Sequence, residues 1–135
     1  MKGVNIMIKI TNELIEIAYK EARENYKIES GMNEISIQNA ITNMMSAGWN
    51  KTGAQWTLPI FNALMSGDCY YRTMSKPQTE IFLNNILNDY GIDSLKQALQ
   101  SVEKHLKYYK TKYKKEMPGI QEIYNNFLLK TIRTW

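Results

Sequence analysis

Residues 93 to 115 carry the pattern that most constrains the fold, because their apolar side chains recur at steps of three and four. At about 100° per residue, this spacing gathers the apolar side chains into one stripe along an α-helix. The stripe consists of Leu95, Leu99, Val102, Leu106, Tyr109 and Tyr113. We therefore expect a long amphipathic helix that packs against the rest of the chain.

The opposite side of this helix is basic. It carries Tyr108 and six lysines: Lys104, Lys107, Lys110, Lys112, Lys114 and Lys115. Lysines neutralise phosphates, and an exposed aromatic ring can stack on a base, so the combination favours a nucleic-acid contact. The alternative is that these lysines only solvate an exposed helix, as lysines commonly do.

The rest of the chain also predicts helices, separated by breaks at Ser30-Gly31, Gly67, Gly91 and Pro118-Gly119. Apolar residues recur at helical spacing in ranges 11–25, 33–47, 60–65, 75–90 and 120–128. Thr11, Asn33 or Ser36, Ser75 and Asp93 are the expected N-caps. The short link at Gly91 predicts an antiparallel hairpin of the fourth and fifth helices. No alternating strand pattern is convincing, so we expect an all-α, single-domain bundle of about five to six helices over residues 1–135.

The segment from Gly48 to Pro59 is expected to be a turn-rich connection between helices. It holds Trp49 and Trp56, two of the three tryptophans. Large aromatic side chains in such a segment either anchor it to the core or remain partly exposed as interface residues. Exposed tryptophans here would favour a protein partner.

Composition and charge restrict the class of protein. The single Cys69 cannot form an internal disulfide, and no apolar run is long enough to cross a bilayer. Residues 1–10 lack the features of a secretory signal, so we expect a cytoplasmic protein with no membrane contact. Residues 1–100 hold nine Lys and Arg against ten Asp and Glu, whereas residues 101–135 hold eight against three. This basic end suits a polyanion or an acidic protein surface.

Catalytic and cofactor motifs are not evident. His105 is the only histidine, there is no Walker A or GxGxxG loop, and a zinc site would need an unusual ligand set. Asp89 and Asp93 could form a carboxylate pair across the Gly91 turn, but capping and solvation of the helix ends is the simpler interpretation. His105 lies at the border of the apolar stripe, where packing competes with a ligand or catalytic role. We expect no enzyme activity, no cofactor and no metal.

A second candidate surface is the segment from Tyr70 to Lys76. Arg72 and Lys76 could contact phosphates there, and Thr73 and Ser75 could donate hydrogen bonds. The alternative is an ordinary connection between helices, in which Ser75 is used as a cap.

The order MSGDCYYRTMSKPQTEIFLNNILNDYGIDSLKQALQSVEKHLKYY, followed by MPGIQEIYNNF, resembles the helical module that precedes the HNH nuclease domain in some bacterial restriction-type endonucleases. The resemblance covers residues 65–127. It implies a specificity or docking module of a DNA-targeting system, with DNA contacts expected for Arg72, Lys104, Lys107 and Tyr108. The histidine-rich metal site of HNH nucleases is absent, since His105 stands alone, so nuclease activity is not implied.

The leading hypothesis is a non-enzymatic module that binds nucleic acid, with DNA favoured over RNA. It would use the basic side of the 93–115 helix, together with Arg72 and Lys76. The alternative is a phage or mobile-element protein that binds and inhibits a host nuclease, of the anti-restriction or anti-CRISPR type. Under that alternative Trp49, Trp56 and part of the lysine side would contact the nuclease.

Overall fold

The computed structural model describes residues 10–26 and 33–132, which form six α-helices and no strand. The helices are α1 (Asn12–Asn25), α2 (Glu34–Ala47), α3 (Lys51–Ser66), α4 (Lys76–Tyr90), α5 (Ile92–Tyr113) and α6 (Pro118–Ile132). The all-α prediction is therefore confirmed. The expected break at Ser30 and Gly31 lies outside the described residues. Within the described part of the chain, no helix combines the length and apolar character of a membrane span.

Side-chain caps fix the start of four helices. Thr11, Asn33, Asn50 and Ser75 each accept a hydrogen bond from the backbone N–H three residues later. Such a cap satisfies one of the N–H groups that a helix N-terminus leaves without a partner. The predictions for Thr11, Asn33 and Ser75 are confirmed.

The prediction of a turn-rich connection from Gly48 to Pro59 is wrong, because α3 begins at Lys51 and continues through Pro59. A proline inside a helix removes one hydrogen bond and costs about 3 kcal/mol or more. Burial of the apolar side of α3 offsets this cost, since Leu58, Phe61 and Leu64 are each at most 1% exposed. Tertiary packing therefore overrides the local signal of Pro59.

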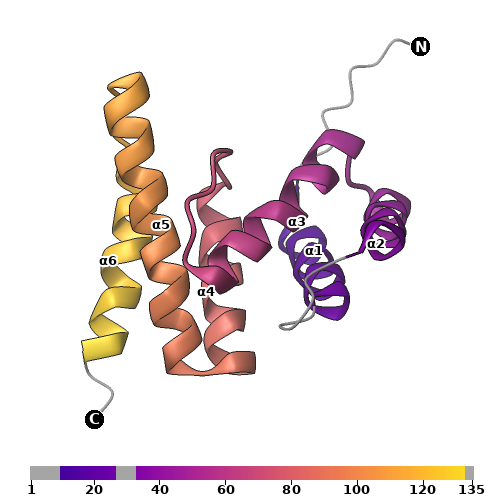
Figure 1. Ribbon diagram of the computed structural model, residues 1–135, viewed down its shortest axis with the longest axis horizontal. Helices are drawn as coiled ribbons and strands as arrows, with labels where there is room; N and C mark the ends of the chain where they lie inside the picture. Colours follow the sequence, from indigo (N-terminus) through magenta and orange to yellow (C-terminus); the bar gives the residue numbers. More distant parts are fainter. Residues whose placement is uncertain (1–9, 27–32, 133–135) are drawn as a thin grey trace.

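The turn between α4 and α5 is a single residue, Gly91, with φ +96°. Such a positive φ suits glycine, which has no Cβ. The two helices run antiparallel, as Figure 1 shows, so the hairpin prediction is confirmed. The cap prediction for Asp93 is wrong: Asp93 lies in the first turn of α5, and no side chain caps this helix. Its carboxylate still faces the positive end of the helix dipole.

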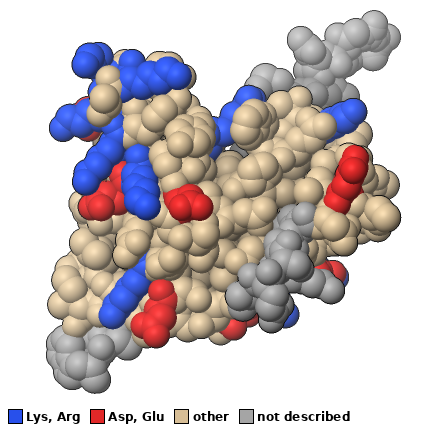
Figure 2. Space-filling view, viewed as in Figure 1, with Lys and Arg blue, Asp and Glu red and all other residues tan. Residues whose placement is uncertain are grey.

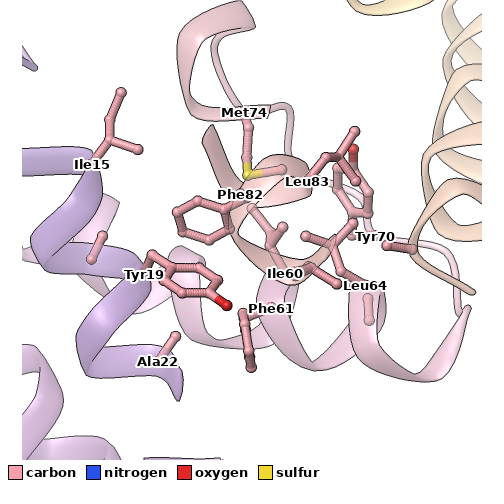
Figure 3. Packing of buried hydrophobic residues seen from close by; sticks show 14 of the residues in the cluster. Ile15, Tyr19, Ala22, Ile60, Phe61, Leu64, Tyr70, Met74, Phe82 and Leu83 are labelled. Atoms are coloured by element: carbon pink, nitrogen blue, oxygen red, sulfur yellow. The ribbon is translucent and has the colours of Figure 1, made fainter. Parts of the chain in front are cut away.

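All six helices contribute buried side chains to the core, and Figure 3 shows the part that lies around α1, α3 and α4. Tyr19, Phe61 and Phe82 meet edge to face, with ring centroids 5.5 to 6.4 Å apart. Met74 enters this core from the segment between α3 and α4. Helix α5 packs on α3, α4 and α6, while α2 packs on α1 and α3. Helices α5 and α6 thus form one end of the molecule and α1 and α2 the other (Figure 1).

Candidate nucleic-acid interface

One side of α5 binds the segment that follows α3. Gln97 donates to the carbonyl of Ser66 at 2.8 Å, and Ser101 donates to the carbonyl of Asp68. The ammonium of Lys104 donates to the carbonyl of Gly67 at 2.7 Å. Carbonyls at a helix C-terminus have no partner within the helix, so these side chains complete the end of α3. The segment is thereby held at a fixed position along α5.

His105 continues this row of contacts and is completely buried. Its Nδ1 lies against the carbonyl oxygen of Tyr70, and its Nε2 lies 3.0 Å from the hydroxyl oxygen of Thr73. Since a carbonyl can only accept, Nδ1 carries the proton and Nε2 accepts from Thr73 in the neutral ring. Burial lowers the pKa of His105, although the bond to Tyr70 opposes this effect. The imidazole therefore serves to position the segment that carries Tyr70 to Thr73.

Four of the candidate lysines bond to a backbone carbonyl or pair with a carboxylate. The ammonium of Lys104 is bonded to the carbonyl of Gly67, so it has a backbone partner. The other three pair with carboxylates: Lys76 with Glu122 at 2.6 Å, Lys107 with Glu103 at 3.9 Å, and Lys110 with Glu116 at 3.7 Å. All three pairs are exposed, and such pairs contribute only about 0–1 kcal/mol. A phosphate can compete for these lysines more readily than for Lys104.

The three remaining lysines, Lys112, Lys114 and Lys115, lie at the C-terminal end of α5. None pairs with a carboxylate of residues 10–26 or 33–132. Figure 2 shows the densest group of Lys and Arg on the visible face over this end of the molecule, with acidic side chains beside and below it. The positive surface is thus narrower than the sequence pattern predicted.

Exposed tyrosines surround these lysines. Tyr113 was expected in the apolar stripe but is 53% exposed, because the last turns of α5 extend beyond the helices that cover its first half. Tyr71, from the segment before α4, is 61% exposed and meets Tyr108 edge to face at 4.8 Å. The ring centroids of Tyr108 and Tyr113 are in turn 6.0 Å apart. We call Tyr71, Tyr108, Lys112, Tyr113, Lys114 and Lys115 the terminal surface.

Lys112 joins the aromatic and basic parts of the terminal surface. Its ammonium donates to the hydroxyl of Tyr108 at 3.1 Å, and it lies over the rings of Tyr108 and Tyr113 at 5.4 and 5.6 Å. The hydrogen bond from Lys112 lowers the pKa of Tyr108, and the same bond raises the pKa of Lys112. The ammonium therefore stays charged at neutral pH.

Lys114 ends α5 in the left-handed conformation, with φ 53°. It is the only residue other than glycine with positive φ in the described ranges. Glycine is the usual residue at this position, and a side chain there costs roughly 1–2 kcal/mol. Lys114 therefore occupies a position where its side chain adds strain, next to the exposed Tyr113.

The two tryptophans of the Gly48–Pro59 segment have different surroundings. Trp49 is 6% exposed and donates from Nε1 to the carbonyl of Leu14 at 2.8 Å, so it anchors the start of α3 and presents little surface to a partner. Trp56 is 40% exposed, and the guanidinium carbon of Arg72 lies 5.2 Å from the centre of its ring. Arg72 is thus brought into contact with Trp56, which the sequence alone did not predict.

Asp89, one of the two carboxylates of the candidate pair Asp89 and Asp93, is already bonded to other residues. Asp89 accepts from the hydroxyl of Tyr19 at 2.7 Å and pairs with Arg23 at 3.2 Å, so it connects α4 to α1. No group of three or more His, Cys, Asp and Glu in the described residues is arranged to hold a metal ion.

Comparison of the chain with protein-family models, with curated protein sequences and with solved structures finds no match in any of the three.

Proposed function

We propose that this protein binds nucleic acid through the terminal surface. The observation that carries the proposal is the contact of Lys112 with the rings of Tyr108 and Tyr113. Among the described residues, Lys112, Lys114 and Lys115 have no carboxylate partner. Ammonium groups attract phosphates, and exposed rings add stacking on bases.

Rigidity of the surface adds to this argument. Tyr71 follows directly on Tyr70, whose carbonyl is bonded to the buried His105, and Tyr108 lies one turn further along α5. A side chain held in place before binding loses less conformational entropy when it contacts a ligand. Tyr71 and Tyr108 are therefore held in position before a ligand binds.

Charge reversal tests the proposal. The variant Lys112→Glu/Lys114→Glu/Lys115→Glu should lose most of its affinity for a labelled oligonucleotide in fluorescence anisotropy at low salt. The control is Lys20→Glu/Lys51→Glu/Lys96→Glu, which reverses the same number of exposed lysines away from the terminal surface. Equal losses in both variants would indicate a general effect of net charge and would contradict the assignment of this surface.

A second candidate function is binding of a protein partner, such as a host nuclease. Exposed apolar side chains favour it: Trp56 on α3, and Leu128, Leu129 and Ile132 on α6. Exposed apolar residues that lie close together often mark protein interfaces. Co-purification that survives nuclease treatment and is lost in Leu129→Asp/Ile132→Asp would support this candidate.

A further inference from the structure

A second aromatic and cationic contact adjoins the terminal surface. Trp56, Tyr71 and Arg72 line a hollow of about 200 Å³, together with the apolar Pro59 and Ile60. Trp56 supplies an exposed ring, Tyr71 a second one, and Arg72 a planar cation above Trp56. Pockets for whole ligands are usually about 300–1,000 Å³, so this hollow suits one flat group of a longer ligand.

The hollow is continuous with the lysines through Tyr71. Tyr71 lines the hollow and also meets Tyr108, which is bonded to Lys112. A row of rings with two cations therefore runs from Trp56 and Arg72, through Tyr71 and Tyr108, to Lys112 and Tyr113. Rings beside cations suit a strand that offers bases for stacking and phosphates for charge contacts.

The exposed rings also distinguish between forms of nucleic acid. In a duplex the base faces are stacked on one another, and a protein reaches only their edges in the grooves. In a single strand the faces are open and can stack on aromatic side chains or on a guanidinium plane. Trp56 and Tyr71 offer stacking surfaces that a duplex cannot use.

We propose that the hollow between Trp56, Tyr71 and Arg72 holds one unpaired base of a single-stranded nucleic acid, with the adjoining phosphates on Lys112, Lys114 and Lys115. This inference rests on the proposed function and names the form of nucleic acid that is bound. The shared chemistry is an unpaired base on a phosphate backbone, which both DNA and RNA provide.

The test compares labelled oligo(dT), oligo(dU), oligo(U) and a DNA duplex of equal length by fluorescence anisotropy. We expect single strands to bind about 10-fold or more tightly than the duplex, since base stacking adds to the phosphate contacts. Oligo(dU) and oligo(U) differ only in the sugar 2′-hydroxyl, so a preference between these two identifies DNA or RNA as the source of the strand. Equal binding of strand and duplex would overturn the inference and leave the proposed function intact, whereas no binding of any oligonucleotide would overturn both.

Substitutions in the hollow provide the second arm. Trp56→Leu should weaken oligo(dT) binding about 5-fold or more and leave duplex binding unchanged, while Trp56→Tyr, which keeps a ring, should retain most of the affinity. Arg72→Lys keeps the positive charge but replaces the planar guanidinium group, which can stack on a base, with an ammonium group. This variant should therefore also weaken binding of the single strand. In the wild-type protein oligo(dT) should quench tryptophan fluorescence, and Trp56→Tyr should remove most of this quenching while it still binds. Unchanged strand affinity in both Trp56→Leu and Arg72→Lys, with folding verified by circular dichroism, would overturn the inference.

Discussion

The imidazole of His105 lies nearly parallel to the ring of Tyr70, with 4.1 Å between the ring centroids and 12° between the planes. Its Nδ1 also bonds to the carbonyl oxygen of the same residue. One side chain of α5 thus holds both the ring and the backbone of Tyr70. Because Tyr71 and Arg72 follow immediately, this contact sets the position of both candidate binding residues.

His105 makes the stability of the fold sensitive to acid. The pKa of His105 is lowered in the folded protein, mainly by burial. Below about pH 6.5 the imidazole is therefore protonated more readily in the unfolded chain than in the folded protein. The stabilisation is complete above that pH and is lost as the pH falls. We expect the urea midpoint of the wild-type protein to fall more steeply below about pH 6.5 than that of His105→Gln. Parallel curves for the two proteins would contradict this role of His105.

Lys104 should act on stability, and Lys107 should not. Lys104→Met removes a hydrogen bond to the carbonyl of Gly67, so we expect the free energy of unfolding to fall by about 0.5–1.5 kcal/mol. Lys107→Met removes only an exposed pair with Glu103, for which we expect a change below about 0.5 kcal/mol. Urea denaturation of the two variants measures the difference. An unchanged free energy of unfolding in Lys104→Met would show that the Gly67 contact has no structural role.

Relief of the backbone strain at Lys114 should stabilise the fold and weaken oligonucleotide binding. Lys114→Gly removes the side chain from a left-handed position, which should raise the free energy of unfolding by about 1 kcal/mol. The same change removes a cation from the terminal surface and should weaken oligonucleotide binding. Denaturation and anisotropy on one sample measure both effects. A more stable variant with full affinity would remove Lys114 from the binding surface.

The sequence predicted the helices mainly where local signals decide them. Thr11, Asn33 and Ser75 were recognisable caps, and Gly91 marked the hairpin, because each acts on backbone groups within a few residues. Pro59 misled the prediction, since burial of α3 against distant residues outweighs its local cost. The rule that a proline ends a helix fails where the flanking turns are deeply packed.

The candidate site was only partly predictable for the same reason. Helical spacing placed Tyr108 and Lys112 on one side of α5, but the helix ends at Tyr113, before Lys114 and Lys115. The spacing also could not show that Lys104 bonds to Gly67. The contacts of Tyr71 with Tyr108 and of Arg72 with Trp56 join residues that are far apart in the chain. The adjacent pair Tyr70-Tyr71 was the only local signal, and it did not indicate which ring would be buried.

The most direct measurement is an NMR titration of the isotope-labelled protein with short oligo(dT) and oligo(U). The account predicts that backbone and side-chain shifts concentrate in residues 70–73 and 108–115 and at the Trp56 indole. It also predicts that α1 and α2, at the other end of the molecule, change little. Shifts confined to α1 and α2, or no shifts with either oligonucleotide, would contradict the account.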